Sequence, residues 1–182
     1  MNFTPKTIQL KNGEEALLRS PTIDDAATLL DYLRITAEET PFLLREPEEC
    51  TMTVAQEQDY LRRTLQSPSI TMLLCEVNGK LAGNCRISRH TKLKTQHRAS
   101  IGIALMQEFW GLGIGTAMFQ ALIHIAGEEG ITQLELEVFA GNQRAIALYQ
   151  KMGFRIVAEH PNAIRQKDGT LISEFLMIKE LN

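Results

Sequence analysis

Apolar and polar positions recur with a helical spacing in two early segments of the chain. Between residues 24 and 34 the apolar side chains follow the pattern i, i+3, i+4, i+7, which predicts an amphipathic helix. Thr53 and Gln56 have the spacing of a capping box, so a second helix is expected from there to about residue 65. The segment 35–52 between them is polar, contains two prolines and is expected to be a loop.

Shorter apolar runs predict strands in the middle and at the ends of the chain. Residues 70–77 and 80–88 flank Asn78-Gly79, a dipeptide typical of tight hairpins, so these two runs are expected to pair antiparallel. The run 98–106 contains Gly102, which indicates a bulge or a close approach by a ligand. The other strands are expected at residues 7–10, 15–19, 133–138, 154–159 and 171–179.

Two more helices are expected in the second half, at residues 113–129, where Gly130 ends the helix, and at 142–152. The order is therefore two early helices, an antiparallel meander, two strand-helix units and a closing hairpin. This order predicts a mixed α/β fold with helices on the faces of a sheet. At 182 residues the chain is expected to form one domain, residues 1–182.

Composition and charge exclude several classes of protein. A net charge of −3 argues against nucleic acid as a partner, because nucleic-acid binders display a basic face. No signal peptide and no membrane-spanning apolar run are expected, which favours a cytoplasmic protein without a membrane partner. The three widely spaced cysteines, Cys50, Cys75 and Cys85, are typical of reduced thiols, and no metal site is expected.

The stretch Trp110-Gly111-Leu112-Gly113-Ile114-Gly115-Thr116 joins a predicted strand to a predicted helix. Glycines at such a junction let backbone N–H groups close on an anion at the positive end of the helix. The stretch lacks the lysine of a P-loop and the glycine spacing of the dinucleotide fingerprint. A phosphate site of another kind and a plain tight turn both remain open at this point.

Residues 103–118 and 136–154 together carry a more specific pattern. The second segment contains Asn142-x-x-Ala-x-x-Leu-Tyr149-x-x-x-Gly-Phe154. With the glycine stretch it resembles the GCN5-related N-acetyltransferase (GNAT) family, over about residues 70–177. The resemblance implies a mixed, mostly antiparallel central sheet flanked by helices, with a splayed pair of parallel strands at the cofactor site.

Acetyl-CoA is the cosubstrate that this resemblance implies, with no metal. In the family its pyrophosphate lies on the glycine stretch and the following helix N-terminus, and its pantetheine arm pairs with the backbone of the preceding strand. Asn142 matches an asparagine that touches the cofactor arm, although it also suits a helix N-cap, and both roles are compatible. The residues implied to bind the cofactor are Ile103, Ala104, Leu105, Gly111, Leu112, Gly113, Ile114, Gly115, Thr116 and Asn142.

The resemblance also implies two catalytic residues. Tyr149 matches a tyrosine that protonates the leaving thiolate in many relatives, while a core aromatic is the alternative. Glu137 matches a general base that acts through water. Glu135 shares its sheet face, so the sequence does not separate the two glutamates.

The chain departs from the family pattern at two positions before the glycines. Trp110 stands where relatives usually have arginine or glutamine, and Gln107 where proline is frequent. The missing cation should weaken the attraction for phosphate without removing the backbone amides. Arg144 and Lys151 are further candidates for phosphate contacts, although solvated helix charges are the favoured interpretation.

The function implied is transfer of an acetyl group from acetyl-CoA to a primary amine by direct attack in a ternary complex. The acceptor is expected to be a protein N-terminus, a polyamine or another small amine. The acidic residues of segment 38–49 could attract such a cation or only be solvated. A non-catalytic acyl-CoA-binding regulatory module is the alternative. Both a monomer and a homodimer remain open.

Overall fold

The computed structural model describes residues 3–181. The chain forms two compact units, each of which is described by itself. The first comprises Met1–Ser88 and Gly102–Met118, and the second comprises Arg89–Ile101 and Phe119–Asn182. The single domain expected over residues 1–182 stays a prediction.

Antiparallel strands build the sheet of the first unit. β1 (Lys6–Gln9) pairs with β2 (Glu15–Arg19), β2 with β3 (Ile70–Val77), and β3 with β4 (Lys80–Arg89). Asn78 and Gly79 have φ angles of 50° and 76°, the left-handed conformation that an Asn-Gly hairpin turn needs. The predicted hairpin is confirmed.

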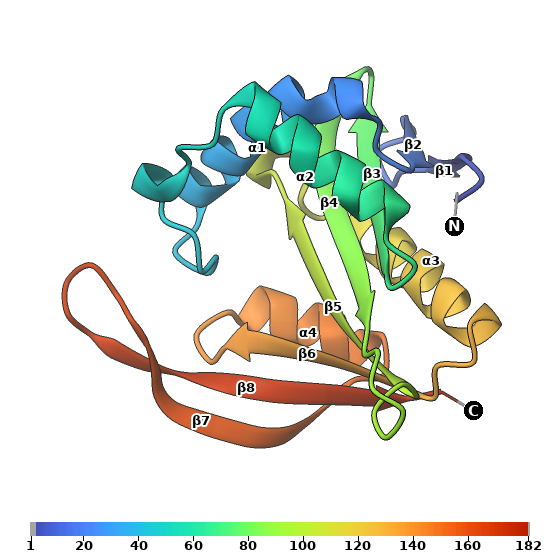
Figure 1. Ribbon diagram of the computed structural model, residues 1–182. Helices are drawn as coiled ribbons and strands as arrows, with labels where there is room; N and C mark the ends of the chain where they lie inside the picture. The colour runs from blue at the N-terminus through green and yellow to red at the C-terminus, as the bar shows by residue number, and fades with distance from the viewer. Residues whose placement is uncertain (1–2, 182) are drawn as a thin grey trace. The chain divides into compact units, whose positions relative to one another are not determined.

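The first two helices, α1 (Ala26–Glu39) and α2 (Val54–Gln66), lie side by side, and α2 also contacts β3 (Figure 1). The Thr53–Gln56 capping box is confirmed, because each side chain accepts a hydrogen bond from the other's backbone N–H. Short 3-10 turns precede each helix, η1 (Ile23–Asp25) and η2 (Pro47–Glu49).

The predicted end of α1 at residue 34 is wrong. The helix continues to Glu39 because Thr36 and Ala37 extend its buried face. Thr40 then adopts extended backbone with φ −151°, as expected for a residue that precedes proline. Two acidic residues assigned to the loop, Glu38 and Glu39, therefore lie on the last turn of a helix.

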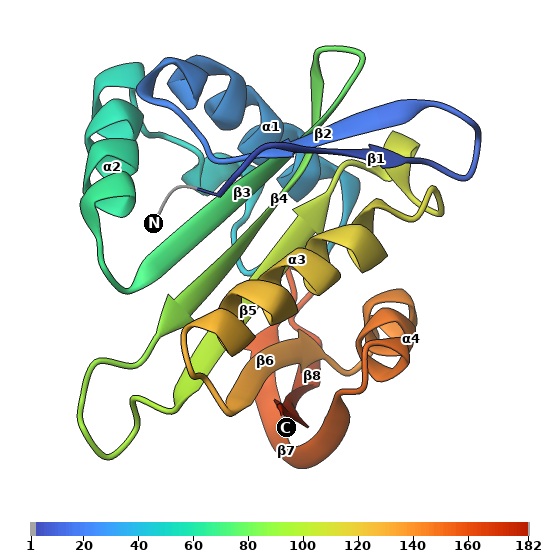
Figure 2. The same cartoon turned by 90° about the vertical axis from the view of Figure 1, so that its right-hand side faces the viewer.

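β5 (Arg98–Leu105), the 3-10 turn η3 (Gln107–Phe109) and α3 (Ile114–Glu128) follow one another along the chain, and Figure 2 shows α3 as one continuous helix. The predicted helix at residues 113–129 is thus confirmed within a residue at each end. Gly130, with φ 71°, ends it in the left-handed conformation typical of helix C-termini.

In the second unit, β5 pairs in parallel with β6 (Gln133–Phe139) over three positions, from Arg98↔Gln133 to Ser100↔Glu135. β6 and β7 (Arg155–Arg165) each pair antiparallel with β8 (Leu171–Glu180), and α4 (Gln143–Lys151) connects β6 to β7. The short parallel pairing agrees with the splayed strands that the resemblance implied.

β7 runs six residues beyond its predicted end at residue 159. The register shifts between His160 and Ile164, where Asn162 has a φ of 55°, so a bulge carries the strand past Pro161. Proline is tolerated here because β7 is the last strand of the sheet, which has the order β1-β2-β3-β4-β5-β6-β8-β7. The mixed, mostly antiparallel α/β fold is confirmed.

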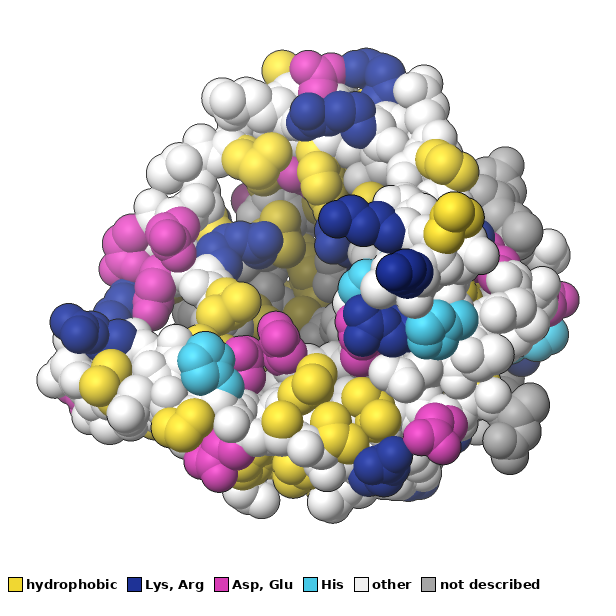
Figure 3. All heavy atoms as spheres, turned by 60° about the horizontal axis from the view of Figure 1, so that its bottom comes forward, with side chains coloured by type: hydrophobic (Ala, Val, Ile, Leu, Met, Phe, Trp, Pro, Cys, Tyr) yellow, Lys and Arg dark blue, Asp and Glu magenta, His cyan; other side chains and the backbone are white. Residues whose placement is uncertain are grey.

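The β7–β8 hairpin exposes apolar side chains. Figure 3 shows hydrophobic side chains gathered on the face over these two strands, and Ile156 and Val157 of β7 are among the exposed apolar residues. Homodimer formation stays a prediction.

Candidate functional site

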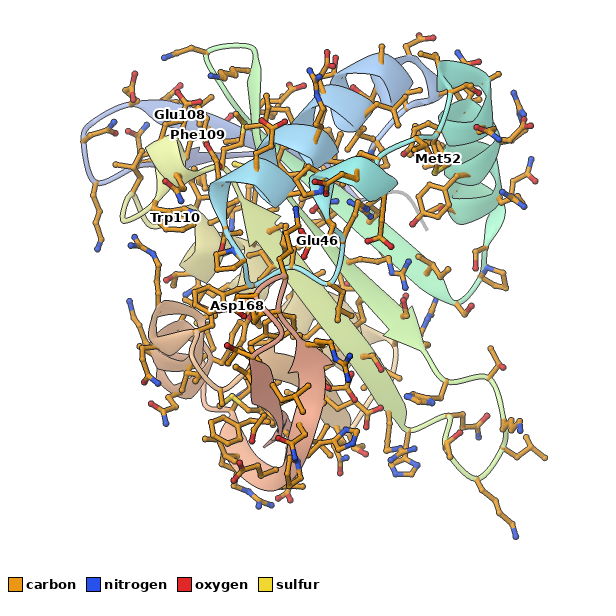
Figure 4. All side chains as sticks on the ribbon, turned by 90° about the vertical axis from the view of Figure 1, so that its left-hand side faces the viewer. Glu46, Met52, Glu108, Phe109, Trp110 and Asp168 are labelled. Atoms are coloured by element: carbon orange, nitrogen blue, oxygen red, sulfur yellow. The ribbon has the colours of Figure 1, made fainter. Side chains whose placement is uncertain are left out.

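The turn before α3 has the backbone conformation that its glycines suggested. Gly111 and Gly113 have φ angles of 81° and 98°, so a side chain at either position would be strained. Glu108, Phe109 and Trp110 lie together just before them, between the end of β5 and the start of α3 (Figure 4). The turn leads directly into a helix of fifteen residues, a geometry that both a phosphate site and a plain tight turn share.

The start of α3 is suited to bind an anion. The first N–H groups of any α-helix have no acceptor within the helix, and the helix dipole makes this end positive. Ile114, Gly115 and Thr116 form the first turn of α3, directly after the two left-handed glycines. The structure therefore brings six predicted cofactor residues, Gly111 to Thr116, into one turn at a helix N-terminus, and their binding of the cofactor stays a prediction.

Three hydrogen bonds hold the end of β5, where Ala104 and Leu105 were predicted to meet the cofactor arm. The Tyr32 hydroxyl donates to the Ala104 carbonyl at 2.7 Å, and the Trp110 indole N–H donates to the Leu105 carbonyl at 2.9 Å. The N–H of Met106 donates to the carbonyl of Ala82 on β4 at 3.0 Å. At the position where relatives usually have arginine or glutamine, this chain therefore has a tryptophan whose hydrogen bond fixes the end of β5.

Tyr32 is a positioning residue that the sequence analysis did not identify. Its buried hydroxyl also accepts a hydrogen bond from the Asn84 N–H at 3.2 Å, so one phenol connects α1, β4 and β5. Burial raises the pKa of Tyr32 above its usual value, which keeps the hydroxyl a donor. Its position three residues after Leu29, on the buried face of the predicted helix, was the only indication in the sequence.

The turn between β1 and β2 lies close to the segment that leads into α3 (Figure 2), and it carries Lys11. Its backbone N–H donates to the Leu112 carbonyl at 3.1 Å. Its side-chain Cγ lies 3.9 Å from the position that a Cβ on Gly113 would occupy. Among residues 3–181 the Lys11 ammonium forms no ion pair, so a cation is available next to the turn in which Trp110 stands where relatives usually have arginine or glutamine.

Tyr149 lies on α4 in an aromatic cluster of the second unit. Its ring centroid is 5.2 Å from that of Phe119 and 6.4 Å from that of Phe154. Burial raises the pKa of Tyr149 to about 12, so the phenol is protonated at neutral pH. The core-aromatic role weighed from the sequence is therefore real, and it fixes the ring in place.

Asn142 is the N-cap of α4, since its side-chain oxygen accepts a hydrogen bond from the Ala145 N–H at 3.1 Å. This confirms the capping role, and the proposed contact with the cofactor arm stays a prediction. Arg144 and Lys151 are exposed on the same helix.

The structure separates the two glutamates of β6. Glu135 lies among partners: its carboxylate is 2.8 Å from His90 Nε2 and 3.5 Å from an Arg98 guanidinium nitrogen, and it accepts from the Ser100 hydroxyl at 3.3 Å. Glu137 is exposed. Glu135 is thus engaged in an ion-pair cluster, which leaves Glu137 as the glutamate of this pair that is open to solvent.

A second carboxylate faces Glu137 across the sheet of the second unit. Burial raises the pKa of Glu174 on β8, and the negative charge of Glu137 raises it further, while His160 on β7 acts in the opposite direction. In the strand register Glu174 lies opposite Phe139 of β6 and opposite His160 of β7, so these three side chains share one face of the sheet. Glu137 lies two positions before Phe139 and therefore points to the same face. The face therefore carries two interacting carboxylates and an imidazole.

Two carboxylates of the acidic segment 38–49 accept hydrogen bonds from backbone N–H groups. Glu39 accepts a hydrogen bond from the Gln107 N–H at 2.7 Å, which ties α1 to η3. Glu49 accepts from the Glu46 N–H at 2.9 Å within η2. These carboxylates stabilise turns, so the segment is more than a solvated acidic surface.

Two further classes of site were searched among residues 3–181. These residues contain no cluster of three or more histidine, cysteine or acidic side chains that would hold a metal ion. None of their helices has the length and apolar character required to cross a membrane.

Comparison with known proteins places this geometry in a family. Residues 32–154 match the model of the acetyltransferase (GNAT) family. The chain is 29% identical to a GNAT-family acetyltransferase from Streptococcus pneumoniae, whose crystal structure superposes with a TM-score of 0.85 and covers 91% of this chain and 99% of that one.

Two curated relatives come from Escherichia coli K12. An L-amino acid N-acetyltransferase is 27% identical over 58% of this chain and 67% of its own length. A ribosomal protein bS18 alanine N-acetyltransferase is 32% identical over 50% of this chain and 60% of its own length. This chain therefore belongs to the GNAT family of acetyltransferases, whose acetyl donor is acetyl-CoA.

Proposed function

We propose that the chain transfers the acetyl group of acetyl-CoA to a primary amine by direct attack within a ternary complex. The observation that carries the proposal is the pair of left-handed glycines, Gly111 and Gly113, immediately before the N-terminus of α3. This turn supplies backbone donors for the pyrophosphate of the coenzyme, while Ile103, Ala104 and Leu105 supply the strand along which its arm extends.

The reaction forms a C–N bond and breaks a C–S bond. The neutral amine attacks the thioester carbonyl carbon, the carbonyl oxygen becomes an oxyanion, and its collapse expels the thiolate of coenzyme A. Backbone N–H groups near Leu105 stabilise the oxyanion. The nitrogen loses one proton and the sulfur gains one, so no covalent enzyme intermediate is needed.

Tyr149 donates the proton that the leaving thiolate gains. Its pKa of about 12 ensures that the phenol carries its proton at working pH. Burial also makes the phenol a weaker acid than usual, and the same exclusion of water raises the pKa of a thiolate beside it. Proton transfer from oxygen to sulfur therefore requires that the sulfur of coenzyme A lies in the same water-excluded surroundings as the phenol.

Glu137 receives the proton of the amine, through water. Its carboxylate is exposed, whereas Glu135 is engaged by His90, Arg98 and Ser100. The neighbouring Glu174, with its raised pKa, provides a second proton acceptor on the same face.

The acceptor class that the relatives favour is an amine borne by an amino acid. One named relative acts on L-amino acids and the other on an alanine of a ribosomal protein. We infer that this chain likewise takes a small primary amine or a peptide N-terminus. The buried free thiols of Cys75 and Cys85 fit a reducing compartment, which supports the proposed cytoplasmic location.

The test measures thiol release from acetyl-CoA by the whole chain with a panel of amino acids, diamines and short peptides. Amine-dependent release above the hydrolysis background supports the transferase. Tight binding of acetyl-CoA with no acetylated product for any amine, detected by mass spectrometry, would instead support the acyl-CoA-binding regulatory module.

Lys11 supplies the cation that the glycine turn lacks, so Lys11→Ala should raise the KM for acetyl-CoA about 3- to 10-fold and leave kcat nearly unchanged. The effect should shrink at high salt, because an exposed charge is screened. Steady-state kinetics at two ionic strengths measure both quantities.

Lys6→Ala is the matched control, because Lys6 is an exposed lysine on β1 of the same hairpin. Equal effects of the two substitutions would show that only net charge matters and would remove Lys11 from the cofactor site.

A further inference from the structure

β7 is the outermost strand of the second unit, and most of it is exposed. It lies at one end of the strand order and pairs with β8 alone among the described strands (Figure 1). The eight residues 155–162 are all exposed. A strand that covers a core buries every second side chain, because successive side chains point to opposite faces. Within residues 3–181, this run of β7 therefore covers no core on either face.

The middle of this run is apolar. Ile156 and Val157 are 42% and 38% exposed, and Ala158 follows them. Val157 is an extra residue against β8, because Ile156 pairs with Met177 and Ala158 pairs with the adjacent Leu176. A bulge of this kind leaves its extra residue outside the ladder. Exposed apolar side chains and unpaired backbone groups thus lie together in one short segment.

The other edge of the sheet is built differently. β1 is only four residues long, Lys6–Gln9, and both of its ends are polar. Short length and an edge lysine are devices by which proteins keep an edge strand from pairing with another chain. Residues 155–160 of β7 contain no lysine, and Pro161, which blunts this edge, comes only after them. Six residues of β7 therefore remain available to a further strand.

The charges at the two ends of the apolar segment complement each other when two copies of it run antiparallel. Residues 155–159 read Arg-Ile-Val-Ala-Glu. If Val157 faces itself, the register places Arg155 of each copy opposite Glu159 of the other. Opposite charges in directly opposed positions stabilise antiparallel strands. In the single chain Arg155 lies 3.0 Å from the exposed Glu180, while Glu159 forms no ion pair among residues 3–181.

We propose that β7 pairs antiparallel with β7 of a second copy of this chain, about a two-fold axis at Val157. The pairing places an Arg155–Glu159 contact on each side of an apolar centre, and it continues the backbone ladder into the second copy. Each copy contributes the same segment, so the contact closes after two copies. Pairing of β7 with β1 of a second copy would instead leave a free edge at each end and would continue without limit.

The size of the contact sets the expected affinity. The bulge at Val157 and the proline at residue 161 limit the paired run, and interfaces below the standard size are usually weak. We therefore expect a dissociation constant of about 1 to 100 µM. The inference goes beyond the transferase proposed above and does not depend on it, because neither the strand pairing nor its test involves acetyl-CoA.

Sedimentation of the whole chain between about 1 µM and about 500 µM measures the association. Hydrogen exchange at the two ends of this range locates the contact. We expect a monomer–dimer equilibrium, with slower exchange of the amides in residues 155–160 at the higher concentration. A chain that stays monomeric throughout would overturn the proposal, and so would a dimer in which exchange slows only outside this segment.

Swapping the two charges tests the register. Arg155→Glu places two glutamates opposite each other, and Glu159→Arg places two arginines opposite each other, at two symmetric positions. Each substitution should weaken the dimer about 10- to 100-fold. The double variant with both substitutions restores opposite charges and should associate within about threefold of the chain without them. Its net charge is unchanged, so recovery is not an effect of total charge. Failure to recover would overturn the proposed register.

Two controls separate this contact from effects within one chain. Glu180→Gln removes the partner of Arg155 in the same chain, so the charge variants are compared in that background. Arg165→Glu reverses an exposed arginine of the same strand beyond Pro161 and should change association by less than about twofold. An equal loss with Arg165→Glu would show that only net charge matters and would overturn the pairing. Unchanged circular dichroism spectra show that the variants are folded.

Cross-linking tests which residue lies on the axis. The thiol introduced by Val157→Cys would face its own counterpart, close enough for a disulfide, so copper-catalysed oxidation by air should link two chains. Leu171→Cys, at the exposed start of β8, is the matched control and should not give linked chains. Both variants keep the native cysteines, so a difference between them is due to the new thiol. Equal linking of the two variants, or none with Val157→Cys, would overturn the proposal.

Discussion

Replacing Tyr149 with phenylalanine is expected to lower kcat by about 10²- to 10⁴-fold, the usual contribution of a positioned general acid. The substitution removes the hydroxyl and keeps the ring that packs against Phe119 and Phe154. The KM for acetyl-CoA and the melting temperature should change little, because neither depends on the hydroxyl. Steady-state kinetics and thermal unfolding measure the two effects separately.

The pH profile gives a second readout for the same residue. Because the pKa of Tyr149 is about 12, the phenol stays protonated up to about pH 10, and its ionisation should not reduce kcat in that range. A kcat of Tyr149→Phe within about twofold of the unsubstituted enzyme would show that water protonates the thiolate. Tyr149 would then have only its role in the aromatic cluster.

The elements that the sequence predicted correctly depend on local interactions. The Asn78-Gly79 hairpin and the Thr53–Gln56 capping box each involve residues within three positions of one another. The ends of α1 and β7 were missed because tertiary context sets them. Burial of Ala37 extends the helix, and a bulge at Asn162 lets an edge strand continue past a proline.

The residues of the candidate site likewise divide into those that a local sequence pattern predicts and those that only the folded chain brings together. The glycine turn is one continuous stretch of sequence, and so is the α4 motif. The residues within each could therefore be predicted together. The ion-pair partners of Glu135, by contrast, are His90 and Arg98, which lie more than thirty-five residues earlier in the chain. No local sequence pattern connects these residues with Glu135. Lys11 likewise becomes a candidate only because the fold places it beside the glycine turn.

Gly83→Ala is expected to lower kcat/KM for acetyl-CoA by about 100-fold, the usual cost of displacing a reactant or its support by about 1 Å. A Cβ on Gly83 of β4 would overlap Leu105 Cδ2 and would lie 2.9 Å from the Ala104 carbonyl oxygen. The leucine side chain can rotate away. The carbonyl belongs to the backbone that Tyr32 holds, so the end of β5 must move.

Two further variants distinguish this displacement from a general effect of alanine. Gly127→Ala, in α3 where an added Cβ meets no atom within 4 Å, should leave kcat/KM unchanged. Adding Leu105→Ala to Gly83→Ala should restore only part of the loss, because it removes the contact with Cδ2 and leaves the contact with the Ala104 oxygen. Full recovery in the double variant would mean that the leucine side chain alone transmits the effect. In that case the backbone position of Ala104, and with it the hydrogen bond from Tyr32, would not limit the binding of acetyl-CoA.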